Sequence, residues 1–210
     1  MNKKEKILNV VKSIGFWMII LLFFEVSFRI IMHYSFNLES IINIVLYSII
    51  IGAFFCFCFQ NLKSKKAKII FGIILFVLAF LFSLQCIFFK IFKTYFSLSS
   101  LKLGDQVGDF KDQAINQIFV KNGLYMVLYL IPFVLFCIFG RKLKIERNTK
   151  FENISFLAIG VIGVLLLILN INLSKGKTNG SYDLRYKVNN VALNNERFGV
   201  LNSYRIDFLR

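Results

Sequence analysis

The sequence is poor in the side chains that most enzymes use for catalysis or for binding a metal. It contains one histidine, His33, and its 11 acidic residues are outnumbered by 26 lysines and arginines. We find no phosphate-binding Walker loop, no dinucleotide fingerprint, no H-E-x-x-H zinc motif and no Cys/His cluster. No group of carboxylates adjoins a hydroxyl that could act as an activated nucleophile. The sequence therefore predicts no catalytic residue and no metal ligand in this chain.

The four cysteines indicate neither a disulfide nor a metal site. All lie within apolar runs, and Cys56 and Cys58 would point to nearly opposite sides of a helix. We interpret all four as small buried hydrophobic residues. The chain also lacks internal repeats of the kind that many transporters carry, and few polar residues interrupt its apolar stretches. Both observations argue against a pathway for ions or solutes.

Apolar sequence, in contrast, is abundant. Hydrophobic residues make up 57% of the 210 residues, more than a soluble domain could keep away from water. Five stretches are close to the length that crosses a bilayer as a helix: 13–32, 40–59, 69–89, 123–139 and 154–173. The first is long and contains charges, so we interpret it as an uncleaved span and not as a signal peptide. The sequence predicts an all-α membrane protein with a five-helix transmembrane domain, 1–173.

Basic residues cluster in alternate connections. The N-terminal segment, the second connection "NLKSKKAK" and the fourth connection "RKLKIERNTK" are rich in lysine and arginine, whereas "HYSFNLE" has neither. Short basic connections stay on the cytoplasmic side of a membrane. We therefore predict a cytoplasmic N-terminus and, after five crossings, an extracellular C-terminus. Most of the +15 net charge then lies in the connections that set the direction of the chain in the membrane. This predicts contact with anionic phospholipid and no binding of nucleic acid.

The outer connection, 90–122, is the only sizeable one. From Leu103 its apolar residues recur at steps of three and four, which predicts an amphipathic helix. Such a helix either lies at the headgroup level or caps the bundle. Four residues where this connection leaves the membrane are candidate contacts for lipid headgroups: Tyr95, Ser97, Ser99 and Lys102.

Glu25 and Arg29 bring opposite charges into the first predicted span. They are four residues apart with the acid first, which places them on one helix face. Charges inside a bilayer are expensive and therefore candidates for function. One interpretation is a structural ion pair that ties the first span to its neighbours. The other is contact between Arg29 and a lipid headgroup phosphate at the outer leaflet.

The tail, 174–210, is polar at first and then carries scattered apolar residues. We interpret its start as a linker. Its end, "FGVLNSYRIDFLR", has apolar residues at helical spacing: Phe198, Leu201, Tyr204 and Phe208. These predict a short surface helix that lies exposed, loosely ordered, or against the membrane.

The layout and three segments, "FGVLNSYRIDFLR", "YFSLSSL" and "YLIPFVLF", resemble the N-terminal region of lipoteichoic acid synthase-like proteins. These are phosphoglycerol transferases of the sulfatase/alkaline-phosphatase-like superfamily. The resemblance implies an extracellular catalytic domain with a threonine nucleophile and manganese or another divalent metal, acting on phosphatidylglycerol. This chain would lack that domain, so we expect no cofactor and no activity in the chain alone.

We therefore expect the membrane-anchor and lipid-presenting portion of such an enzyme, either a fragment or a truncated product. Phosphoethanolamine transferases share the layout, and a small non-enzymatic protein that scaffolds or regulates envelope assembly is the alternative. The abundance of Phe, Ile, Lys and Asn is typical of AT-rich genomes. We accordingly expect a bacterial cell membrane as the location.

Overall fold

The structure, a computed structural model, describes residues 3–59, 64–97, 122–139 and 149–209. Within these ranges every regular element is an α-helix, which confirms the all-α part of the predicted fold class. Five helices are long and apolar: α1 (Lys3–Met32), α2 (Leu38–Phe59), α3 (Ser64–Phe92), α5 (Gly123–Phe139) and α6 (Lys150–Leu173). Three short helices follow: α7 (Ser181–Tyr186), α8 (Val191–Phe198) and α9 (Val200–Phe208).

Four of these helices, α1, α2, α3 and α6, are long and apolar enough to cross a membrane. Helix α5 is equally apolar but has only 17 residues. A multi-pass membrane protein is thus confirmed, whereas the fifth span and the direction of the chain stay predictions. The amphipathic helix predicted for the outer connection lies outside the described residues.

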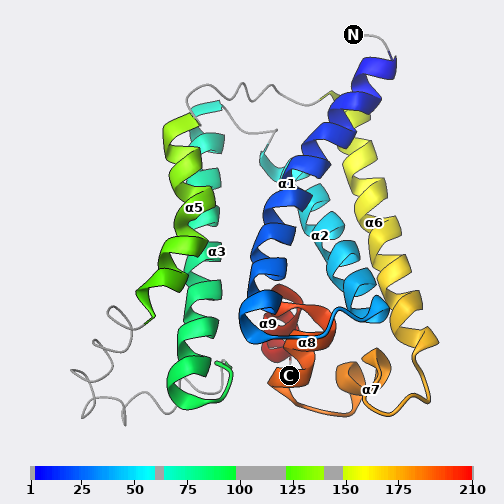
Figure 1. The fold of residues 1–210 in the computed structure, drawn as a ribbon. Helices are drawn as coiled ribbons and strands as arrows, with labels where there is room; N and C mark the ends of the chain where they lie inside the picture. The colour runs from blue at the N-terminus through cyan, green and yellow to red at the C-terminus, as the bar shows by residue number, and fades with distance from the viewer. Residues whose placement is uncertain (1–2, 60–63, 98–121, 140–148, 210) are drawn as a thin grey trace.

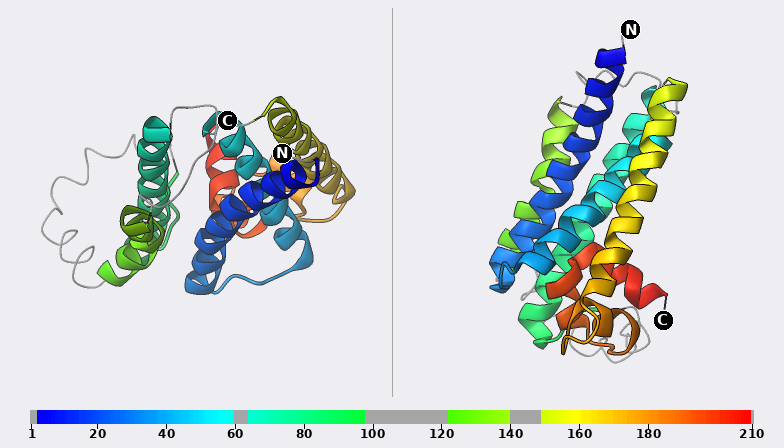
Figure 2. Two further views of the ribbon diagram at one scale, coloured as in Figure 1. Left: turned by 90° about the horizontal axis from the view of Figure 1, so that it is seen from above. Right: turned by 90° about the vertical axis from the view of Figure 1, so that its right-hand side faces the viewer.

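The helices form two groups (Figure 1). Helix α2 packs between α1 and α6, and α3 packs mainly on α5. The view from above in Figure 2 shows the same separation, with α3 and α5 beside the other three. Helices α2 and α6 pack closely at Gly163 of α6, where a Cβ would lie 2.8 Å from Cγ1 of Ile50 on α2. A side chain at this position would require Ile50 or the helices to shift.

Aromatic side chains join the two groups. Phe24 and Phe28 of α1 are fully buried against Phe82 of α3, with ring centroids 5.2 and 6.0 Å from that of Phe82. Tyr129 of α5 completes this cluster, with its ring stacked on Phe24 at 6.0 Å. Such ring pairs are worth about 0.5–1.5 kcal/mol beyond the area that they bury.

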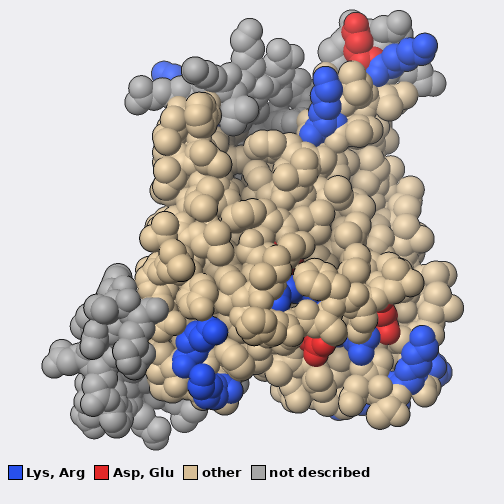
Figure 3. Space-filling view, viewed as in Figure 1, with Lys and Arg blue, Asp and Glu red and all other residues tan. Residues whose placement is uncertain are grey.

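The outer surface of the helices is apolar. Figure 3 shows charged side chains gathered toward the two ends of the molecule, with a broad band between them that has few charged side chains. A basic side chain is visible in a small hollow within this band. Leu124 and Ile154 are among the large apolar side chains that remain exposed. An apolar band of this kind fits the hydrocarbon core of a bilayer.

The tail does not lie on the surface as expected. Helices α8 and α9 pack among the ends of the long helices, and α8 contacts α2 (Figure 1). Val200 and Ile206 are fully buried, whereas Phe208, predicted for the apolar face, is 76% exposed. The expectation was wrong because it considered only the apolar spacing of the tail. Polar groups of the long helices hold these two helices in place, as described next.

Candidate functional site

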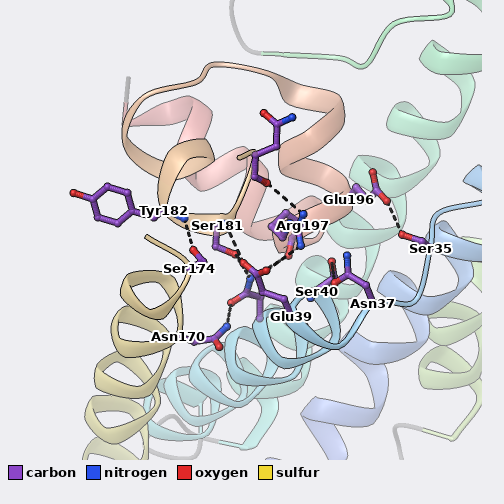
Figure 4. A network of polar contacts seen from close by, with 12 residues as sticks. Ser35, Asn37, Glu39, Ser40, Asn170, Ser174, Ser181, Tyr182, Glu196 and Arg197 are labelled. Carbon is purple, nitrogen blue, oxygen red and sulfur yellow. Dashed lines mark hydrogen bonds and ion pairs between the residues drawn. The ribbon is translucent and has the colours of Figure 1, made fainter. Parts of the chain in front are cut away.

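Polar side chains, some of them fully buried, gather where α1 ends and α2 begins. We call this group the polar layer, and Figure 4 shows the part of it around Glu39, Ser181 and Arg197. Its members come from four segments of the membrane bundle and from α7 and α8. They are Glu25, Arg29, Ser35, Glu39, Asn43, Asn170, Ser181, Glu196 and Arg197.

Glu25 caps the N-terminus of α9. Its carboxylate is 4% exposed and accepts hydrogen bonds from the backbone N–H groups of Val200, at 3.0 Å, and Leu201, at 3.1 Å. The N-cap residue of α9, Gly199, has no side chain that could do so. The first N–H groups of a helix have no partner within the helix and carry a partial positive charge. A carboxylate from α1, 175 positions away, therefore serves as the cap.

Gly199 is required by this cap for two reasons. Its φ of +81° lies in the left-handed region, which residues with a side chain rarely adopt. A Cβ at this position would also lie 2.7 Å from Oε2 of Glu25. The glycine in the motif "FGVL" thus makes room for a specific carboxylate.

Arg29 lies one turn after Glu25 and is 2% exposed. Its Nη1 donates to the carbonyl of Glu196 at 2.7 Å, and its Nη2 donates to the carbonyl of Ser35. The planar guanidinium thus joins α8 to the connection between α1 and α2. Within the described part of the chain, the hydrogen bonds of Glu25 and Arg29 run to backbone groups and not from one side chain to the other.

A second set of contacts centres on Glu39 and Asn43 of α2. Glu39 pairs with Arg197 at 3.1 Å and accepts from the backbone N–H of Ser181 at 3.0 Å. Asn43 donates to the hydroxyl of Ser181 at 3.0 Å and to the carbonyl of Arg197 at 3.2 Å. It accepts from Asn170 of α6 at 2.8 Å. Four helices, α2, α6, α7 and α8, are therefore joined through two side chains.

The structure describes two of the four candidate lipid contacts, Tyr95 and Ser97. Tyr95 stacks on Phe89, with centroids 4.6 Å apart, and burial raises its pKa, so the phenol is neutral. Ser97 is 8% exposed. Ser99 and Lys102 lie outside the described residues, and contact of this group with lipid headgroups stays a prediction.

The family of this chain follows from a comparison with known protein families. The chain matches the family model described as the lipoteichoic acid synthase N-terminal domain over residues 1–205. The chain belongs to this family. No curated protein and no solved structure matches it. The resemblance inferred from the tail and the spans is therefore confirmed.

In this lipoteichoic acid synthase N-terminal domain, we tested whether the divalent metal implied by the family would find ligands. Among the described residues, no group of three or more His, Cys, Asp or Glu side chains could hold a metal ion. The carboxylates of the polar layer, Glu25 and Glu39, bind N–H groups and an arginine. These residues do not fit a metal site.

Proposed function

We propose that this chain is the membrane portion of a lipoteichoic acid synthase-like enzyme that acts in glycerophosphate polymer synthesis. It crosses the membrane five times, with its N-terminus in the cytoplasm and its C-terminus outside. The basic connections support this direction. Helix α5, with 17 residues, spans about 26 Å at ~1.5 Å per residue, which is at the short end of the range for a span.

Its role would be to hold the start of an outer phosphoglycerol transferase domain in a fixed position. The observation that carries this proposal is the way in which the tail is bound. Four of its backbone groups, the N–H groups of Val200 and Leu201 and the carbonyls of Glu196 and Arg197, bind side chains of α1 and α2. A flexible tether would make no such contacts. The bundle thus fixes the position and direction of α9.

We further propose that the chain binds an anionic phospholipid such as phosphatidylglycerol. Lysine and arginine side chains lie toward both ends of the apolar band in Figure 3. Basic side chains at the membrane surface attract anionic headgroups, each by about 1 kcal/mol. In the complete enzyme, this contact would keep lipid close to the outer domain.

The positioning role can be tested with a chimera. The chain is joined to the outer domain of a lipoteichoic acid synthase and expressed in a bacterial strain depleted of its own synthase. We expect glycerophosphate polymer to be restored, and Glu25→Ala to reduce polymer at an equal level of membrane-inserted protein. The control joins the same outer domain to an unrelated single span through a flexible Gly/Ser linker. Equal polymer from this control would contradict the positioning role.

A further inference from the structure

Arg205 of α9 reaches into the membrane bundle. Its guanidinium carbon lies 5.4 Å from the centre of the Tyr47 ring. Tyr47 is the tenth residue of α2, about 14 Å from the start of that helix at ~1.5 Å per residue. A positive charge is therefore held over an aromatic face at a depth where charges are costly.

No carboxylate pairs with this charge among the described residues. The ion pairs found there join Arg197 to Glu39 and Lys187 to Asp183. The Nε of Arg205 is buried and has no hydrogen-bond partner. Arg205 is only partly buried, so its charge keeps some contact with solvent, and a nearby anion would replace the hydration that its buried part has lost.

Asn202 lies one turn before Arg205 on α9. It is fully buried, and neither its amide nitrogen nor its amide oxygen has a hydrogen-bond partner. Residues three positions apart are neighbours on a helix surface. An unmade hydrogen bond of a buried polar group costs about 1–3 kcal/mol. A buried amide without hydrogen-bond partners, one turn from a partly buried cation, is an arrangement that a polar ligand would satisfy.

We propose that Arg205, Asn202 and Tyr47 form a binding site for a phosphate group, supplied by the headgroup of an anionic phospholipid. The guanidinium would donate to the phosphate oxygens, as arginine does at other phosphate sites. The amide of Asn202 can donate to the same group and accept from a headgroup hydroxyl. This inference rests on the lipid contact proposed above and assigns it to specific residues.

The test measures thermal unfolding of the full chain in a neutral detergent with added phosphatidylglycerol, phosphatidylcholine or inorganic phosphate. We expect phosphatidylglycerol to raise the unfolding midpoint and phosphatidylcholine to leave it unchanged. Arg205→Gln should weaken binding at least about tenfold, as for the loss of a charged hydrogen bond, and should abolish the shift at the same lipid concentration. A shift with inorganic phosphate as well would show that the site takes the free anion, whereas a shift with lipid alone would show that the acyl chains are needed.

Two further variants separate binding from folding. Asn202→Leu removes the unpaired amide, so we expect an equal or higher midpoint without lipid and no shift with it. Lys187→Gln removes a positive charge from an exposed position of the tail and should keep the full shift.

A normal shift in both Arg205→Gln and Asn202→Leu would overturn this site, and so would a lower midpoint of Asn202→Leu without lipid. If the unchanged chain does not respond to phosphatidylglycerol, the proposed lipid contact fails together with the site.

Discussion

The carboxylate of Glu25 fills the space that a side chain at Gly199 would need, because a Cβ there would lie 2.7 Å from Glu25 Oε2. These two residues are far apart in the sequence and belong to different parts of the protein, a long membrane helix and the tail. Their contact joins the two parts. It also explains why the tail helix begins where it does, at Val200, whose N–H binds the same carboxylate.

Replacing Gly199 with alanine should destabilise the protein through backbone strain and through the loss of room for Glu25. Gly176 also has a positive φ, +90°, but a Cβ there would meet nothing within 4 Å. Gly176→Ala should therefore cost about 1–2 kcal/mol from backbone strain alone. Gly199→Ala should cost at least about 1 kcal/mol more, because its backbone, with ψ 165°, lies in a region open essentially only to glycine and because Glu25 must move away from the N–H groups of Val200 and Leu201. Thermal unfolding in neutral detergent measures both, and equal losses would contradict the close fit.

The ion pair between Glu39 and Arg197 should contribute to the stability of the tail. Both side chains are about one-fifth exposed, so solvent weakens their attraction, and a double-mutant cycle with glutamine should give a coupling energy of about 1 kcal/mol. The pair of Asp183 and Lys187 is the control. The Lys187 side chain is 64% exposed, so solvent screens its charge and we expect no measurable coupling. A coupling energy for Glu39 and Arg197 that does not exceed that of the control pair would contradict a role of this ion pair in stabilising the tail.

The direction of the chain can be tested with a reporter that is active only in the cytoplasm. Fusions after Lys66 and Lys144 should be active, because these residues lie in basic connections. Fusions after Asp109 and Lys187 should be inactive. Cytoplasmic activity at Lys187 would reverse the predicted direction and contradict an outer catalytic domain.

The chain alone should not catalyse phosphoryl transfer. Such transfer requires positioned groups that stabilise the developing charge, usually with a metal, and the sequence predicts neither the nucleophile nor the ligands. The purified chain is mixed with manganese and phosphatidylglycerol, and diacylglycerol is measured. The control is an identically purified, unrelated membrane protein. If the chain produces more diacylglycerol than this control, it contains a catalytic site and the prediction is wrong.

The long helices could be predicted from the sequence because each apolar run determines its own structure. The predicted span 123–139 coincides with α5, and 40–59 differs from α2 only at its start. The other helices extend beyond the predicted spans because a helix continues into polar residues that a count of apolar ones leaves out. Helix α6, for example, begins at a capping box of Thr149 and Glu152, ahead of its apolar run.

The polar layer could not be predicted in the same way, because its contacts join residues that are distant in the sequence. The sequence shows that Glu25 is a charge at a costly position in the membrane. It does not show the partners of Glu25, because the N–H groups of Val200 and Leu201 belong to the backbone, which is the same for every residue type except proline. Asn43 and Asn170 appear as isolated polar residues in two spans, although they bind each other. Their shared depth in the membrane could have indicated this pair, since both lie near the same predicted surface.

The central claim is that α1 holds α9 through Glu25, and amide hydrogen exchange tests it most directly. The exchange rates of the N–H groups of Val200 and Leu201 are measured in the unchanged chain and in Glu25→Ala, with Glu5→Ala as a control of equal charge at the far end of α1. We predict slow exchange in the unchanged chain and in Glu5→Ala. In Glu25→Ala we predict exchange at least about tenfold faster, as expected for the loss of about 1.4 kcal/mol of local protection. Exchange that is equally slow in Glu25→Ala would contradict the claim.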